Sequence, residues 1–120
     1  MIRNLIDLFF KQKPKWYKVF SSLSEASEKI PLNRAVAVDV EGKQICLIHN
    51  SKGFYGIENR CPHQEAPLHR GACEGDHYFV CPYHRLKIDI VNGHSENNKY
   101  APIKTYPIKA DAKGVFIGIE

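Results

Sequence analysis

The sequence is poor in the features that mark membrane, disulfide-rich and multidomain proteins. It contains no run of about 18 apolar residues, so no segment is expected to cross a membrane as a helix. Four cysteines in 120 residues are too few for a small scaffold held together by disulfides. The length favours one domain and leaves no room for a nucleotide-binding domain beside a catalytic one. Because 43% of the residues are hydrophobic and 25% are charged, a disordered chain is also excluded.

Surplus positive charge is confined to the beginning of the chain. The net charge is +4, and residues 1–18 account for all of it. The remaining residues hold equal numbers of basic and acidic side chains, so they present no general basic surface for nucleic acid. Nucleic acid is therefore not an expected partner, and acidic partners are expected at the N-terminal segment. Its basic residues are Arg3, Lys11, Lys13, Lys15 and Lys18.

Residues 1–14 read as an amphipathic helical extension. Apolar side chains recur with helical spacing up to Phe10, and Pro14 ends the pattern. Asn4 and Asp7 interrupt the apolar stretch and no cleavage site follows, so a secretory signal is not expected and the cytoplasm is the expected location. The helix is expected to pack on its own domain or on a second copy, as in a homo-oligomer. The alternative is membrane-surface contact by residues 1–13.

Residues 15–120 predict an all-β domain, an antiparallel sandwich or open barrel. Short alternating stretches are separated by turn signals, which is typical of that class. A short helix or a turn is expected over residues 21–30, where Ser22 and Glu25 have capping-box spacing. The interval between Asn59 and Asp76 is a loop by composition, and loops of that length usually carry function. The expected strands are 15–20, 35–40, 43–49, 54–58, 77–80, 86–90, 103–108 and 115–119.

Two short motifs carry residues that bind metals. Cys61-Pro62-His63 and Cys81-Pro82-Tyr83-His84 each follow a predicted strand and each place proline directly after cysteine. A thiolate and an imidazole so close in sequence can face a metal from one loop, and two such loops supply four ligands. Zinc fingers commonly pair cysteine with cysteine and histidine with histidine, which these motifs do not.

This C-x-H and C-x-x-H pattern resembles the Rieske iron–sulfur signature. The resemblance extends from about Trp16 to the C-terminus and implies a Rieske-type fold with a two-loop cluster-binding subdomain. It also implies one 2Fe–2S cluster, with Cys61 and Cys81 on one iron and His63 and His84 on the other. The flanking residues that strengthen it are Glu58–Arg60, Gln64–Leu68, Phe79–Val80, Ile88–Asp89 and Asn92–Gly93.

The resemblance further implies a potential at the low end of the Rieske range. Neutral histidine ligands leave the oxidised cluster uncharged, so it accepts an electron more readily than a four-cysteine cluster does. High-potential members add a disulfide between the two loops, but the matching positions here are Ala66 and Tyr83. They also place Gly-Ser after the last histidine, where this chain has Arg85-Leu86. Fewer hydrogen-bond donors to sulfur lower the potential.

Two further positions are notable against the family pattern. Arg85 stands where the family usually has glycine, so a positive φ there would strain the arginine. Its side chain then either places a cation beside the cluster or is a solvated loop residue. Tyr100-Ala101-Pro102 resembles the proline loop that shields the cluster in this family.

The other cysteines and histidines are expected to be bystanders. Cys46 lies in an apolar stretch and is expected in the core, and Cys73 is expected to be a spectator thiol, with a redox-sensitive role as the alternative. The remaining histidines lack ligand spacing with one another: His49, His69, His77 and His94.

The expected function is therefore one-electron transfer from a reductase to a terminal oxygenase or similar enzyme. The chain has no second iron site and is not expected to be an enzyme by itself. The alternatives are a small Rieske subunit of a nitrite reductase, a structural Cys₂His₂ zinc module, and a redox sensor that uses the cluster and Cys73.

Overall fold

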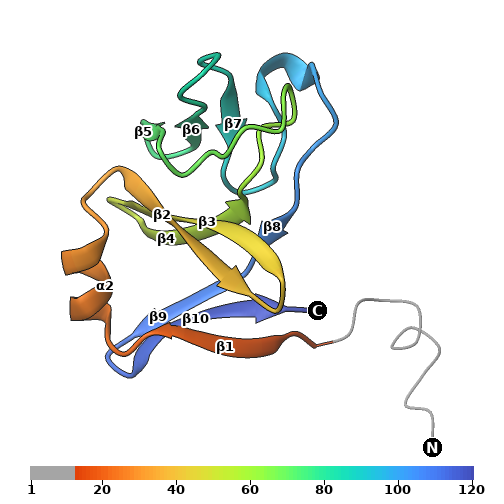
Figure 1. The fold of residues 1–120 in the computed structure, drawn as a ribbon. Coiled ribbons are helices and arrows are strands. Elements are labelled where there is room, and N and C mark those ends of the chain that lie inside the picture. Colours follow the sequence, from red (N-terminus) through yellow and green to blue (C-terminus); the bar gives the residue numbers. More distant parts are fainter. Residues whose placement is uncertain (1–12) are drawn as a thin grey trace, which may run out of the picture.

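The computed structural model describes residues 13–120, which form three antiparallel sheets (Figure 1). The expected helix over residues 1–14 lies almost wholly outside this range, so its anchoring and dimer-forming roles stay predictions. Within the described range, no helix is long and apolar enough to cross a bilayer. The all-β prediction for the rest of the chain is confirmed.

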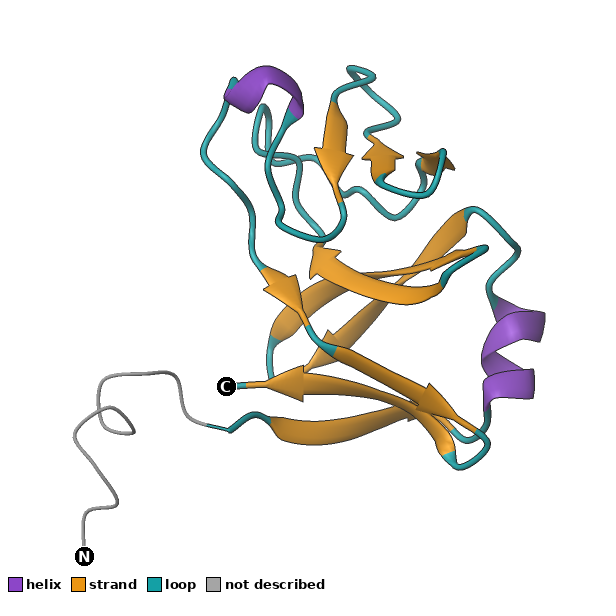
Figure 2. Ribbon diagram, turned by 180° about the vertical axis from the view of Figure 1, so that it is seen from behind, coloured by secondary structure: helices purple, strands orange, loops and turns teal. Residues whose placement is uncertain are grey.

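Two of the sheets form the base of the molecule. One has the order β1-β10-β9 and the other β2-β3-β4-β8, and their side chains form two of the three core clusters among the described residues. The helix α2 (Leu23–Lys29) packs at one side of them (Figure 2). The strands are β1 (Lys15–Phe20), β2 (Arg34–Val40), β3 (Lys43–Asn50), β4 (Gly53–Glu58), β8 (Thr105–Tyr106), β9 (Ile108–Asp111) and β10 (Gly114–Ile119).

The third sheet stands on top of the base as a smaller subdomain. Its strands β5 (Ala72–Glu74), β6 (Tyr78–Val80) and β7 (Lys87–Asp89) are short and are followed by the 3₁₀ helix η1 (Glu96–Asn98). The loops that precede β5 and link β6 to β7 lie at the end of the molecule farthest from β1 and β10 (Figure 1). The subdomain inserts between β4 and β8, so both of its ends are tied to one base sheet.

The helix α2 begins where the capping residues predict. The Ser22 hydroxyl accepts a hydrogen bond from the Glu25 N–H at 3.0 Å, which satisfies a free donor of the first turn. The Glu25 carboxylate accepts from the Ser21 N–H at 2.7 Å, one residue earlier than the usual reciprocal bond. The buried side chain of Ala26 then faces the base sheets.

Two details of the strand prediction are wrong. A single strand over residues 103–108 is divided at Pro107 into β8, which pairs with β4, and β9, which pairs with β10. Proline has no N–H to continue a ladder, and the chain changes sheets there. The loop between Asn59 and Asp76 also contains β5, whose backbone pairs with β6 although its three residues carry little strand signal.

Candidate metal centre

The first of the two motifs forms a tight loop after β4. In this first Cys-Pro loop (residues 61–66), the Cys61 N–H donates to the Ala66 carbonyl at 2.7 Å and the Glu65 N–H donates to the Cys61 carbonyl at 2.7 Å. Glu65 has a φ of 59°, which closes the turn. These bonds bring the ends of the loop together and hold the Cys61 side chain in the core while His63 is exposed.

The second motif repeats this backbone design between β6 and β7. In the second Cys-Pro loop (residues 81–86), the Cys81 N–H donates to the Leu86 carbonyl at 2.9 Å and the Arg85 N–H donates to the Cys81 carbonyl at 3.0 Å. Arg85 has a φ of 57°, matching Glu65 of the first loop. The positive φ considered for Arg85 is therefore present, and an arginine carries the strain that glycine would avoid.

The structure brings the four predicted ligands together as two matched pairs. Cys61 and Cys81 are both fully buried, and each contributes to the same core cluster beneath the loops. His63 and His84 are exposed, with ring centroids 4.5 Å apart and planes at 89°. The thiols thus form the inner side of the site and the imidazoles form its outer side.

The surroundings of Cys61 suit a thiolate that is bound to a metal. Burial and the neighbouring Cys81 raise the pKa of the Cys61 thiol, and the backbone N–H groups of His63 and Gln64 lower it. A bound cation removes the proton and compensates the burial, while those N–H groups remain aimed at sulfur. All cysteines of the described residues are free thiols.

A third segment closes over the histidine side of the site. The Tyr100 ring lies 5.2 Å from the His63 ring, centroid to centroid, so the segment expected to resemble a proline loop lies beside the predicted ligands. The buried Ser95 hydroxyl accepts a hydrogen bond from the Tyr100 N–H at 3.0 Å. Ser95 therefore fixes where this segment turns, a role that the sequence analysis missed.

Asn59 fastens the first Cys-Pro loop and was also missed. Its side chain is buried, and its Oδ1 accepts hydrogen bonds from the N–H groups of Leu68 and His69 at 2.8 and 2.9 Å. Its amide nitrogen donates to His69 Nδ1 at 3.1 Å. One side chain thus ties the end of β4 to the far limb of the loop, and the available signal was an asparagine directly after a strand.

Replacing Asn59 by alanine is expected to lower the free energy of unfolding by about 2–4 kcal/mol. The substitution leaves two N–H groups without their acceptor, one of them on buried Leu68, and each lost bond costs about 1–2 kcal/mol. Urea denaturation of the cluster-loaded protein measures the change. Asn59→Asp keeps an acceptor at the same place, so it should lose less than half of the stability that Asn59→Ala loses. Equal losses in both variants would contradict the role of Oδ1.

The other cysteines and histidines lie outside the pairs. Burial raises the pKa of Cys46 strongly and that of Cys73 to about 11, which disfavours the reactive thiolate form of both. His49 is bonded through Nδ1 to the Ile30 carbonyl at 2.7 Å, and His94 faces Asn98 at 2.9 Å. Within residues 13–120, no three cysteine, histidine or acidic side chains are grouped as one metal ion would require.

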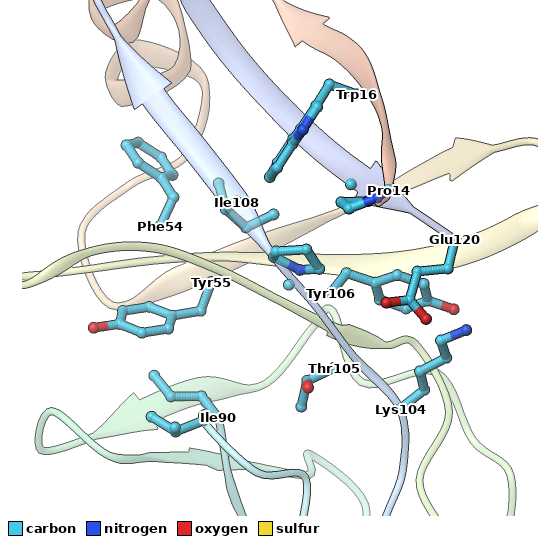
Figure 3. A pocket seen from close by; sticks show the side chains of 14 residues that line it. Pro14, Trp16, Phe54, Tyr55, Ile90, Lys104, Thr105, Tyr106, Ile108 and Glu120 are labelled. Atoms are coloured by element: carbon cyan, nitrogen blue, oxygen red, sulfur yellow. The ribbon is translucent and has the colours of Figure 1, made fainter. Parts of the chain in front are cut away.

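A large cavity lies on the base and not at the Cys-Pro loops. It has a volume of about 740 Å³, and aromatic side chains of β1, β4 and β8 line it, among them Trp16, Tyr55 and Tyr106 (Figure 3). Lys104 and Glu120 lie at one side of it (Figure 3). Its lining contains no cysteine or histidine, so it offers none of the ligands that the motifs supply.

Comparison with known proteins identifies the family. Residues 15–107 match the model of the Rieske [2Fe-2S] domain. The chain is 33% identical over 95 residues to the ferredoxin component of a naphthalene 1,2-dioxygenase system from Pseudomonas aeruginosa, covering 76% of this chain and 88% of the relative. It is 26% identical to the ferredoxin component of an alkene monooxygenase system from Xanthobacter autotrophicus, covering 68% and 67%.

Solved structures agree in fold. The ferredoxin of carbazole 1,9a-dioxygenase from Nocardioides aromaticivorans matches with a TM-score of 0.70 at 19% identity, covering 92% of this chain and all of that chain. A structure described as the small subunit of an NADH-dependent nitrite reductase from Mycobacterium tuberculosis matches with a TM-score of 0.73 at 17% identity, covering 90% and 96%. The chain therefore belongs to the Rieske [2Fe-2S] domain family, as a Rieske-type ferredoxin that carries electrons on a 2Fe–2S cluster with two cysteine and two histidine ligands.

Proposed function

We propose that Cys61 and Cys81 bind one iron of the cluster and that His63 and His84 bind the other. The observation that carries this assignment is that the exposed imidazoles lie 4.5 Å apart, centroid to centroid, while the thiols of the same two loops are buried in one core cluster. Two loops with the same backbone hydrogen bonds each present one thiol and one imidazole. When bound, the cluster accepts and releases single electrons.

The division into two pairs favours a cluster over a zinc site. A structural zinc ion needs four ligands around one centre at about 2.0–2.3 Å. Here the thiols lie on the inner side and the imidazoles on the outer side, and no three such side chains are grouped for one ion among residues 13–120. This arrangement supports two metal positions, each with two protein ligands.

We further propose that the protein passes electrons from a reductase to a terminal oxygenase in the cytoplasm. Two relatives that are about a third identical to this chain over the matched residues, and that are matched over most of their length, are ferredoxin components of oxygenase systems. The nitrite reductase subunit shares the fold at 17% identity, which supports no common client. His63 and His84 are exposed, so a docked partner can contact the predicted ligands directly.

The reduction potential is expected below about +100 mV, in the lower part of the Rieske range of about −150 to +300 mV. The positions that form a disulfide in high-potential members hold Ala66 and Tyr83, and neither loop has a serine hydroxyl after its histidine. Each of these absences removes support for the reduced cluster. Redox titration followed by visible absorption measures the midpoint. A value above about +100 mV would contradict the proposal for oxygenase systems.

A further inference from the structure

Arg85 occupies a backbone position that costs energy to hold with a side chain. Its φ is 57°, in the left-handed region that glycine or asparagine adopts more readily. The residue directly follows His84, and its side chain is exposed. Glycine would close the same turn with less backbone strain. The strain at Arg85, beside the cluster, therefore points to a use for the arginine side chain.

Two other arginines join Arg85 on one flank of the Cys-Pro loops. Arg70 and Arg85 line the same hollow of about 320 Å³, together with Cys73 and Cys81. Arg34, at the start of β2, donates from its guanidinium to the Arg70 carbonyl at 3.4 Å. All three side chains are exposed, although they come from three separate parts of the sequence.

The acidic groups near the hollow do not balance three arginines. Asp76 is one of them, since its charge acts on Cys73, which lines the hollow. Glu74 also lines the hollow, but it is paired with Lys87 at 2.6 Å. The other ion pair found among residues 13–120 joins Arg60 to Glu58, so neither pair neutralises Arg34, Arg70 or Arg85. We call Arg34, Arg70 and Arg85 together the cationic rim.

We propose that the cationic rim docks a carboxylate-rich surface of the redox partner beside His84. This inference rests on the proposed function, because it names the chemistry of the partner that approaches the same site. Arginine matches carboxylate geometry with two parallel N–H donors. Attraction between opposite charges speeds the encounter and orients the partner, and transient redox complexes depend on such steering because their interfaces are small.

Small charged oxidants test the electrostatic effect of the cationic rim without the natural partner. The reduced protein gives one electron to one ferricyanide, a trivalent anion, which becomes ferrocyanide. At ~0.01 M ionic strength, Arg70→Gln and Arg85→Gln are each expected to slow this reaction about threefold, and the double variant about tenfold. The same variants should speed reaction with hexaamminecobalt(III), a trivalent cation. Both effects should vanish near 0.5 M salt.

Matched controls separate the rim from net charge and from folding. Lys109→Gln/Lys113→Gln removes the same charge at exposed positions on the sheet farthest from the Cys-Pro loops (Figure 1). It should slow the ferricyanide reaction clearly less than the Arg70→Gln/Arg85→Gln variant does, because the attraction between charges falls with distance. Arg85→Gly removes the charge and relieves the backbone, so it should slow ferricyanide oxidation while the melting temperature stays equal or rises. A structural role for Arg85 would lower the melting temperature in the same variant.

A short polyglutamate peptide tests binding of carboxylates directly. It should inhibit ferricyanide oxidation of the unmodified protein at low salt, and it should not inhibit the Arg70→Gln/Arg85→Gln variant. Equal rates in rim and control variants, or equal inhibition of both proteins, would overturn the cationic rim. A protein that lacks the 2Fe–2S spectrum would instead overturn the proposed function, so the two failures are distinguishable.

Discussion

Replacing Cys81 by serine is expected to remove the 2Fe–2S cluster, with less than about a tenth of the iron retained. A serine hydroxyl is not ionised near neutrality and is a much poorer ligand for iron in a cluster than a thiolate. Cys61→Ser should have the same effect. Visible absorption, iron and acid-labile sulfide contents, and electron paramagnetic resonance of the reduced protein measure the loss.

The two other cysteines provide controls for the same experiment. Cys73→Ser and Cys46→Ala should keep the cluster, because both thiols lie outside the pairs. Circular dichroism reports whether the Cys81→Ser variant keeps its strands. The His84→Cys variant gives a second test, which does not depend on loss of the cluster. A third thiolate should retain iron and lower the potential, since it adds negative charge to the site. A cluster that survives in Cys81→Ser or is unchanged in His84→Cys would contradict the ligand assignment.

Replacing Gly71 by alanine is expected to destabilise the subdomain by about 3 kcal/mol. A Cβ at this position would lie 2.0 Å from the Val80 carbonyl oxygen and 2.9 Å from the Phe79 ring. The closest atom belongs to the backbone directly before Cys81, so the clash cannot be relieved by a side-chain rotation. The melting temperature should fall by about 10 °C, and thermal unfolding followed by circular dichroism measures it.

Gly75 provides the matched control, because its substitution is costly for a different reason. Gly75 has a φ of 67°, and no atom lies within 4 Å of the Cβ that alanine would add. Gly75→Ala should therefore cost about 1 kcal/mol, the price of a left-handed backbone alone. If both alanine variants lost equal stability, close packing of Gly71 against β6 would not be the cause.

Local sequence signals predicted most of the base. Glu41 and Gly42 both have positive φ, so the hairpin between β2 and β3 turns where these residues allow it. The helix α2 begins at the serine cap, since that bond depends on residues three apart. β5 was missed because its pairing with β6 and the bond from the Cys73 N–H to the Asn33 carbonyl come from distant parts of the chain. Such pairings are invisible to local propensity.

The distribution of charge along the sequence differs from its distribution on the folded protein. The sequence placed the surplus positive charge at residues 1–18 and predicted acidic partners there. The fold also joins Arg34 to the Arg70 carbonyl across 36 positions, and it places Arg70 and Arg85 on one hollow. A net charge of zero for the body of the domain therefore conceals a local positive flank beside the predicted ligands.

The sequence by itself determined the chemistry of the site, because ligand type and spacing within a loop are local properties. The motifs Cys-Pro-His and Cys-Pro-Tyr-His supply two thiols and two imidazoles, and the family match confirms the 2Fe–2S cluster. Only the tertiary structure decided that the thiols face inward, that Asn59 fastens the first loop, and that three arginines share one flank. Those features depend on contacts between segments far apart in sequence, which burial and sheet pairing bring together.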